Sequence, residues 1–319
     1  MTDDTASTPP AEDAFALLGN DTRMGILRAL GDAGEPLSFS ALYDRVDVQG
    51  SGQFNYHLEQ LVGHFVAKTD AGYDLTRAGR RVVEAVLAGT VTRDPTVERT
   101  RVAETCPHCD APVEVVWQSG NVWMYCTECQ GRYGSEHDVP GDGGDQQGDS
   151  SGYLGRHPLP PAGVQGRTPE EMLRAAWTWG NLEIMAMASG LCPRCSGSVE
   201  RSVRVCEDHD PGSGRCGSCD NRYAVNVSYD CTTCIFGGGG MAVIALVTHP
   251  ALLDLLTDHG HNPVAPDRIH DVSQVHSNYE ERVVSTDPLE AEFTFALGGD
   301  TLLLRVDEHL DVIEATRNP

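Results

Sequence analysis

The spacing of cysteines constrains this 319-residue chain more than any other feature of its sequence. All eleven cysteines stand in short pairs: ten form five Cys-x-x-Cys pairs, and the eleventh is Cys206, paired with His209. Such pairs form the knuckles of tetrahedral zinc sites, in which thiolate sulfurs lie about 2.3 Å from the metal. The eleven cysteines and this histidine suffice for three closed four-ligand sites. We therefore expect three Zn²⁺ ions to be cofactors of the fold.

The first two pairs have the spacing of a zinc ribbon. Cys106 and Cys109 are followed, after a short interval, by Cys126 and Cys129. Apolar residues alternate on both sides of the turn at residues 119–121, which predicts a β-hairpin that brings the two pairs to one end. Two pairs at this spacing favour one metal site over a redox-active dithiol.

The remaining eight ligands allow more than one pairing. Residues 199–205 and 222–229 alternate as two strands of similar length, about 20 to 25 Å each. One antiparallel hairpin of these strands would nest two sites, one at its open end and one at its turn. The outer site would contain Cys192, Cys195, Cys231 and Cys234, and the inner site Cys206, His209, Cys216 and Cys219. A cross-braced alternative, in which Cys192, Cys195, Cys216 and Cys219 share a metal, stays open.

Residues 13–90 have the pattern of a winged helix-turn-helix domain. Apolar residues recur at helical spacing in successive short segments, and in the fourth of these Phe54, Leu58 and Leu61 form an inward stripe. A hairpin signal at residues 70–72 precedes a last helix. The outward face of the fourth helix offers amide, phenol and imidazole groups, which suit base edges in a DNA major groove. The candidate DNA contacts are Gln53, Asn55, Tyr56, His57, Gln60, Arg45, Lys68 and Arg77.

Three runs in this region resemble arsenical-repressor-type (ArsR-like) winged-helix regulators: residues 17–30, 54–62 and 73–80. Their order and spacing match that family over about residues 13 to 88. The resemblance implies a dimeric regulator that reads operator DNA through Gln53, Asn55, Tyr56 and His57. Residues 37–50 lack the cysteine pair with which some members sense metal. The complete chain is similar to regulators of halophilic archaea that join such a domain to cysteine-rich C-terminal modules.

Composition indicates a protein adapted to concentrated salt. The chain has 47 acidic and 23 basic residues, a formal net charge of −24, and Lys68 is its one lysine. Carboxylates stay hydrated in brine, where their mutual repulsion is screened; an ordinary acidic protein is the alternative that we favour less. A low basic content argues against DNA binding in dilute salt, but counterion release contributes little at molar salt. Much of the positive charge lies within residues 13–90.

The rest of the sequence predicts an α+β multidomain protein. We expect a disordered tail over residues 1–12, a zinc ribbon over 100–135, and a linker over 136–166, which is rich in Gly, Asp, Ser and Pro. Residues 167–319 should hold a helix over 168–190, both further zinc sites and a small α+β region.

Apolar residues cover much of the circumference of that helix, which argues for packing on more than one side. Beyond the last cysteine we expect a flexible glycine connector over residues 237–240, a strand over 241–247 and a helix near 250–259. A hairpin should turn at residues 298–300. The histidines of this region are expected to be solvated.

Two hypotheses about function follow. The first is a DNA-binding transcriptional regulator that acts as a homodimer on double-stranded DNA, with structural or sensory zinc. The second is a zinc-dependent adaptor that binds protein partners through the winged helix and the ribbons without DNA. The sequence contains no phosphate loop, dinucleotide fingerprint or hydrolase motif, so we expect no enzymatic activity. It also lacks a long apolar segment and a signal peptide, which predicts a cytoplasmic protein without a membrane partner.

Overall fold

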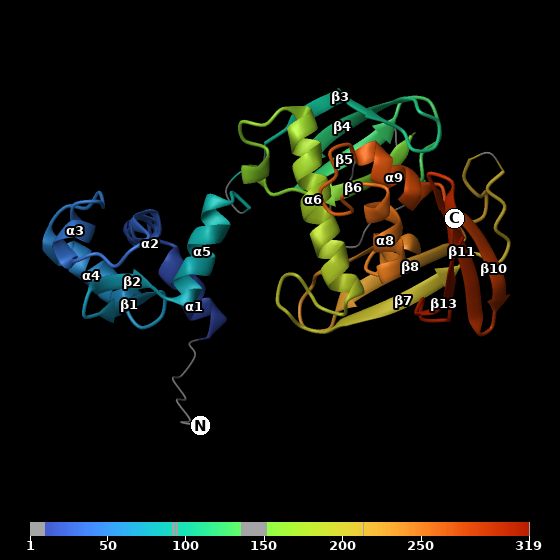
Figure 1. Cartoon of the computed structure of the whole chain (residues 1–319). Helices are drawn as coiled ribbons and strands as arrows, with labels where there is room; N and C mark the ends of the chain where they lie inside the picture. Colours follow the sequence, from blue (N-terminus) through green and yellow to red (C-terminus); the bar gives the residue numbers. More distant parts are fainter. Residues whose placement is uncertain (1–9, 91–92, 94, 135–151, 213, 319) are drawn as a thin grey trace. The chain divides into compact units, whose positions relative to one another are not determined.

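The computed structural model describes residues 10–90, 93, 95–134, 152–212 and 214–318 (Figure 1). These residues fall into two compact units, Met1–Arg93 and Asp94–Pro319. Each unit has its own hydrophobic core, and both mix helices with antiparallel sheets. The chain is therefore of the α+β class, as predicted.

The described part of the first unit contains helices and one two-stranded sheet. Its helices are α1 (Ala11–Leu18), α2 (Asp21–Ala33), α3 (Phe39–Tyr43), α4 (Ser51–Leu61) and α5 (Arg77–Leu87). The strands β1 (Val66–Thr69) and β2 (Gly72–Leu75) lie between α4 and α5. This order follows the sequence-based expectation, except that α1 already begins within the tail expected over residues 1–12. Residues 1–9 of that tail lie outside the described residues.

An aromatic cluster holds α3 against α4. Phe54 is fully buried on the inner face of α4, as are Leu58 and Leu61. The rings of Phe39 and Tyr43 on α3 meet that of Phe54 edge to face, at centroid distances of 5.1 and 5.2 Å. Such pairs add to the burial of apolar area, so α4 presents its opposite face at a defined angle.

The loop before α3 pairs with strand β2 of the hairpin through a single antiparallel bridge. Leu37 and Tyr73 exchange two backbone hydrogen bonds, of 2.9 and 2.8 Å. The close approach requires Gly72, which has a φ of 131° and where a Cβ would lie 2.4 Å from the carbonyl oxygen of Leu37. The wing-like hairpin is therefore tied to the helices by residues distant in the sequence.

Three antiparallel sheets and several helices make up the described part of the second unit. The first sheet contains β3 (Val97–Thr105), β4 (Pro112–Gln118), β5 (Asn121–Cys126) and β6 (Tyr153–Pro158). The second contains β7 (Val199–Val205), β8 (Val225–Cys231) and β9 (Gly237–Met241). The third contains β10 (Glu280–Thr286), β11 (Leu289–Leu297), β12 (Asp300–Val306) and β13 (Val312–Asn318). The helical elements are η1 (Pro161–Gly163), α6 (Pro169–Ala188), α7 (Val243–Leu246), α8 (Pro250–Asp258) and α9 (Ile269–Ser277).

One continuous core joins the three sheets of this unit. Buried residues of β4, β8, β11 and β12 belong to the same cluster as those of α6, α8 and α9. In Figure 1, α8 and α9 lie among the sheets, and α6 runs along one side. The cysteine-rich segments are therefore not independent beads on a string but parts of one packed body.

The predicted linker over residues 136–166 is wrong in its second half. Tyr153–Pro158 form β6, which pairs along β5. Leu154 and Leu159 are buried, and the indole nitrogen of Trp117 donates to the carbonyl oxygen of Leu159 at 2.8 Å. The polar composition of the whole stretch concealed this short apolar run. Residues 135–151 lie outside the described residues.

The region after the last cysteine pair differs from the prediction at two places. The glycines expected to form a flexible connector lie in β9, where a Cβ on Gly239 would be 2.4 Å from the carbonyl oxygen of Val227 on β8. Residues Val243–Leu246 form the short helix α7 rather than a strand. The predicted helix and hairpin are present as α8 and as β11 with β12, while α9 was not predicted.

Candidate metal centres and nucleic-acid interface

The structure gathers the twelve candidate ligands into three groups of four, and the ligand atoms of each group lie within 4.8 Å of one another. The first group contains Cys106, Cys109, Cys126 and Cys129, the outer group Cys192, Cys195, Cys231 and Cys234, and the inner group Cys206, His209, Cys216 and Cys219. This is the nested arrangement. The cross-braced set is not among the groups formed by the described residues.

The first group lies where the turn after β3 meets the end of β5. The Sγ atoms of Cys106 and Cys129 are 3.7 Å apart, and those of Cys109 and Cys126 are 3.4 Å apart. Sulfurs around a tetrahedral zinc ion would be about 3.8 Å apart. Backbone N–H groups of His108 and Gly131 donate to Cys106 and Cys129 at 3.4 Å each. The four sulfurs therefore fit one thiolate-bound metal ion.

The outer group forms at the open end of the hairpin of β7 and β8. Val199 pairs with Cys231, so the first residue of β7 lies beside the last residue of β8. The sulfurs of Cys192 and Cys234 are 3.7 Å apart, and those of Cys195 and Cys231 are 3.4 Å apart. Equal strand lengths thus bring together two pairs that are distant in the sequence.

The inner group lies at the other end of the same hairpin, where Val205 pairs with Val225. His209 directs Nδ1 to the sulfur of Cys219 at 3.4 Å, and its Nε2 lies 3.1 Å from the carbonyl oxygen of Arg222. An N–H at Nε2 that donates to this oxygen leaves the lone pair of Nδ1 available to a metal. The histidine is thus oriented as a fourth ligand.

Backbone donors stabilise individual thiolates in the outer and inner groups. N–H groups of Asp210, Cys219 and Ser218 lower the pKa of Cys216 to about 6, and those of Cys234 and Thr233 lower the pKa of Cys231 to about 6. Burial acts in the opposite direction at Cys219, whose pKa rises to about 12. A metal ion that binds all the cysteines of a group as thiolates must therefore displace the protons of those with a raised pKa.

The first and inner groups are joined by a connection that sequence reasoning missed. The segment after Cys129 pairs with the segment around Cys219: Gly134 donates to the carbonyl oxygen of Asp220 at 2.9 Å, and Arg222 donates to that of Arg132 at 3.1 Å. Both segments read Cys-x-x-Cys-x-x-Arg-Tyr, at residues 126–133 and 216–223. This repeat was the signal available in the sequence. The two knuckles support each other across the pairing.

Helix α9 packs on this connection through polar contacts. Arg132 donates to the hydroxyl of Ser277, and the hydroxyl of Tyr223 donates to the carbonyl oxygen of the same serine. The ring of Tyr223 stacks on that of Tyr279 with centroids 4.3 Å apart. Burial lowers the pKa of His108, inside the first knuckle, to about 3, so this histidine is neutral beside the arginines.

The histidines near the C-terminus are not uniformly solvated, contrary to the prediction. His276 is buried, and burial lowers its pKa to about 4. His270 lies 2.9 Å from the hydroxyl of Thr105, and His259 lies 3.3 Å from a carboxylate oxygen of Asp300. The rings of His270 and His259 thus connect α9 and the end of α8 to strands of the first and third sheets.

Most of the predicted DNA contacts on α4 lie on its exposed face. Gln53, Asn55 and Gln60 are exposed, and Tyr56 retains 60% of its accessible surface. His57 is the exception: it is 8% exposed, so its assignment to the outward face is wrong. Position 57 lies one helical turn after Phe54 and next to Leu58, which places it on the buried stripe. The inward stripe is thus wider than its apolar residues indicate.

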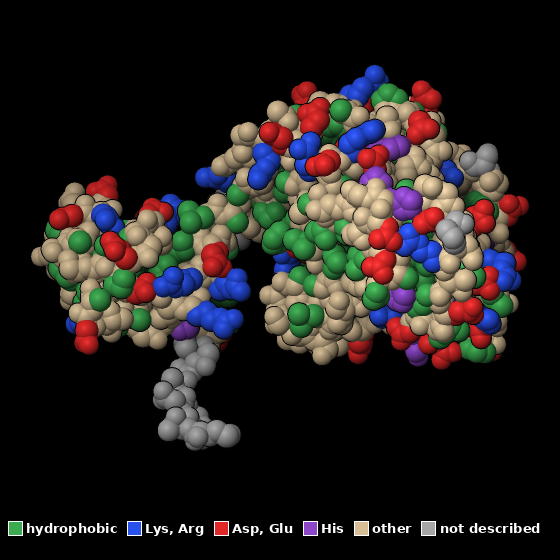
Figure 2. Space-filling view, viewed as in Figure 1, with side chains coloured by type: hydrophobic (Ala, Val, Ile, Leu, Met, Phe, Trp, Pro, Cys, Tyr) green, Lys and Arg blue, Asp and Glu red, His purple; other side chains and the backbone are tan. Residues whose placement is uncertain are grey.

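The predicted basic contacts are exposed and form no ion pairs with the residues that the structure describes. Arg45, Lys68 and Arg77 are exposed, and the ammonium of Lys68 lies 5.7 Å from the ring centroid of Tyr73. By contrast, Arg80 pairs with Asp74 at 2.9 Å, and Arg81 pairs with Glu84. The visible face of the first unit mixes acidic and basic side chains (Figure 2).

Comparison with known proteins identifies two family models, both of unknown function. Residues 11–86, which cover nearly all of the first unit, match the domain of unknown function DUF7347. Residues 103–312 match the domain of unknown function DUF7351. No curated protein and no solved structure matches the chain. None of the described helices is both long and apolar enough to cross a membrane.

The larger match contains all three metal groups and reaches into the last strand of the third sheet. It also covers more than half of the 319 residues. The chain therefore belongs to the family described as domain of unknown function DUF7351.

Proposed function

We propose that this protein is a sequence-specific DNA-binding transcriptional regulator whose first unit is an ArsR-like winged helix-turn-helix. The observation that carries the proposal is the division of α4 into two faces. One face is sealed by Phe54, Leu58 and Leu61, while the other exposes Asn55, Tyr56 and further amide groups. Exposed amides on a rigidly packed helix are the groups that read base edges in a major groove.

In this proposal α4 enters the major groove and its amides supply the specificity. Gln53, Asn55 and Gln60 bring both donors and acceptors, and an amide can bond both N6 and N7 of adenine. Arg45, Lys68 and Arg77 contact phosphates, which positions the helix without reading sequence. His57 lies behind this surface, with its ring centroid 5.3 Å from that of Tyr56, and positions that phenol ring.

We further propose that the metal in all three groups is zinc. Sulfur and imidazole nitrogen in tetrahedral sets of four are typical ligands of structural zinc. Bound zinc would cross-link each pair of knuckles, and with four protein ligands it would leave no position for a substrate. The role that we assign to these groups is therefore to hold the second unit in shape rather than to catalyse a reaction.

The regulator would act as a homodimer on double-stranded DNA, as the resemblance to ArsR-like proteins implies, and we propose that it does so in the cytoplasm. A two-fold dimer presents two copies of α4 to two half-sites, so the operator should be a near-palindrome. The surface carries a large negative charge, and operator binding should therefore be tested in concentrated salt, where the repulsion between protein and DNA is screened.

Genome-wide occupancy of the intact protein tests this proposal. We expect discrete sites in the wild type and their loss when Gln53 and Asn55 are both changed to alanine. Gln118→Ala in the second unit, which has no part in α4, is the matched control and should keep the sites. Absence of discrete sites for the wild type at every salt concentration, with stable protein partners recovered instead, would support a protein-binding adaptor and refute the regulator.

A further inference from the structure

Among the residues that the structure describes, helix α6 is covered mainly on one side, although its sequence predicts packing on more than one side. Met172, Leu173 and Ala176 are buried against the first sheet and the core. On the opposite side Trp179 and Leu182 keep 42% and 49% of their accessible surface. Hydrophobic side chains form a continuous group along this side of α6 in the space-filling view (Figure 2). An apolar helix face of this kind needs a reason to remain uncovered.

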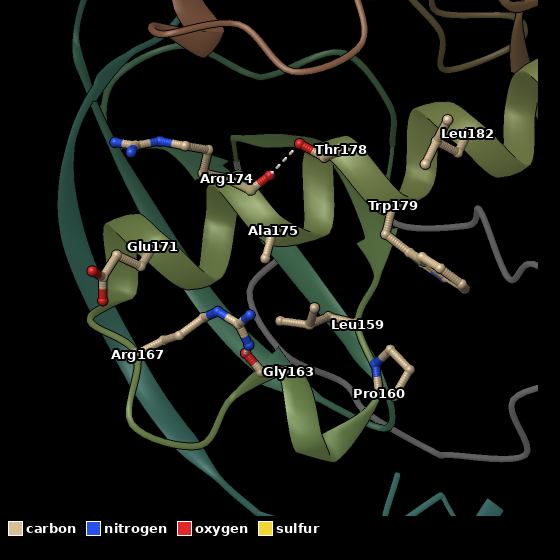
Figure 3. A pocket seen from close by; sticks show the side chains of 10 residues that line it. All are labelled: Leu159, Pro160, Gly163, Arg167, Glu171, Arg174, Ala175, Thr178, Trp179 and Leu182. Atoms are coloured by element: carbon tan, nitrogen blue, oxygen red, sulfur yellow. Dashed lines mark hydrogen bonds between the residues drawn. The ribbon is translucent and has the colours of Figure 1, made fainter. Parts of the chain in front are cut away.

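This face is one wall of a groove. The segment of residues 159–163, which leads into and forms η1, makes the opposite wall, and the two border an open groove with a volume of about 540 Å³. Leu159 of one wall and Ala175 of the other line the groove, and Trp179 stands at one end (Figure 3). Grooves of roughly 300 to 1,000 Å³ with apolar walls are typical of small-molecule sites.

A guanidinium group lies inside the groove. Arg167 extends across it towards η1 and donates one N–H to the carbonyl oxygen of Gly163 at 2.7 Å (Figure 3). Its other N–H groups make no hydrogen bond to any described residue. This bond holds the guanidinium in place while leaving donors for a ligand, because arginine carries five N–H groups in a planar fork.

The charges at the rim also favour an anion. Arg174 is exposed and forms no ion pair with any residue that the structure describes. Glu171 is the one carboxylate on the lining, and its side chain already accepts from the backbone N–H of Thr168 at 2.9 Å as part of the helix cap. The groove is locally basic and apolar, although the chain has a net charge of −24, and it is therefore complementary to a ligand with a negative charge and an apolar part.

We propose that this groove binds a small organic anion with an apolar body, such as an acyl or aryl carboxylate. The carboxylate accepts hydrogen bonds from Arg167, and the hydrocarbon part covers Trp179 and Leu182. The size of the groove and the placement of its one inward guanidinium suit such a molecule better than a flat protein surface. The inference depends only on α6 and the segment of residues 159–167, and it stands whether or not the first unit binds DNA.

Octanoate and its neutral counterpart octanamide are suitable probes, used on the full-length, zinc-loaded protein in molar potassium chloride. We expect octanoate to bind about 5-fold more tightly than octanamide, because a charge-assisted hydrogen bond is partly screened in this salt. Isothermal titration measures both, and displacement of the fluorescent anion 8-anilinonaphthalene-1-sulfonate gives an independent reading.

Three variants locate the site. Arg167→Gln should remove the preference for octanoate, and Trp179→Ala should weaken both probes by about 10-fold, because a large apolar contact is lost. Arg204→Gln changes an exposed arginine on β7 and should alter neither affinity. Arg167 and Trp179 are both exposed, so these variants should keep the wild-type melting temperature. If Arg167→Gln lowers the melting temperature, Arg174→Gln replaces it in the binding experiment.

The proposal is overturned if the wild type shows no saturable binding, or if the first two variants bind like the Arg204→Gln control. Equal affinities of the wild type for both probes would also overturn it, because the guanidinium would then have no role. Sedimentation of the same proteins tests whether a second copy of the chain occupies the groove instead. If Trp179→Ala converts a dimer into a monomer and no probe binds the wild type, the groove is an interface between two copies.

Discussion

Replacing Cys206 by serine should show whether the three groups of ligands bind their metal ions independently. The inner group then has three ligands, and serine is a poor ligand for a soft, thiolate-bound metal. We expect the variant to lose one zinc equivalent, because the outer group lies at the other end of the hairpin and shares no ligand with it. Native mass spectrometry counts the metal ions that remain.

The same substitution should weaken the first group without emptying it. Two backbone hydrogen bonds, from Gly134 to Asp220 and from Arg222 to Arg132, join the two knuckles. Each contributes about 0.5 to 1.5 kcal/mol, so loosening the inner knuckle should cost the first group about 1 to 3 kcal/mol of binding free energy. This corresponds to a decrease of about 5- to 150-fold in its affinity.

Competition with a chromophoric zinc chelator measures that decrease directly. Cys195→Ser, in the outer group, is the matched control: it should also release one equivalent, but the other two sites should keep their wild-type affinities. Simultaneous loss of the inner and outer metals in Cys206→Ser would show that those ligands share a metal. An unchanged affinity of the first group would refute the coupling through the paired knuckles.

Three further predictions concern stability. Gly72→Ala should destabilise the first unit by at least about 2 kcal/mol, because the positive φ of Gly72 and its contact with Leu37 both exclude a Cβ. The control is Gly52→Ala, which should be neutral or stabilising because a Cβ there meets no other atom. Denaturant melts in molar salt compare the two variants. Leu58→Ala should cost about 2 to 5 kcal/mol in the same assay, because it opens a cavity beneath the proposed DNA-reading face, and a cost below about 1 kcal/mol would mean that α4 is not packed as described. Burial lowers the pKa of His157 to about 4, so on acidification the unfolded chain binds a proton at this histidine before the folded chain does. The free energy of unfolding should therefore fall as the pH drops below about 6.5, by about 2 kcal/mol from pH 7 to pH 5. A His157→Leu variant should show a smaller dependence on pH in thermal melts than the wild type.

Local patterns accounted for much of what was predicted correctly. The apolar stripe of α4, the helix α6 and the hairpin of β11 and β12 depend on residues that are close to each other in the sequence. The sequence also favoured the nested grouping of the candidate metal ligands, because two strands of equal length bring their flanking pairs together, and the structure has this grouping. In each case the determining interactions are short in sequence or fixed by strand geometry.

Most of the errors arose where a segment pairs with a strand that is distant in the sequence. Tyr153–Pro158 look like a linker until β5 offers an edge, and the glycines of β9 look flexible until β8 approaches them closely. His57 is polar, but its neighbours on α4 draw it into the core. No local pattern states which partner will be present.

The sequence by itself indicated which residues are candidate metal ligands, favoured their nested grouping over a cross-braced one, and indicated which helix carries an exposed row of amides. Only the tertiary structure decided that the cysteine-rich segments form one body, that two metal knuckles pair through their Arg-Tyr repeats, and that α6 is left open above a groove. The physical reason is that ligand spacing and helical periodicity are properties of neighbouring residues. Burial depends on which distant surface arrives to exclude water, and that is settled only when the whole chain is packed.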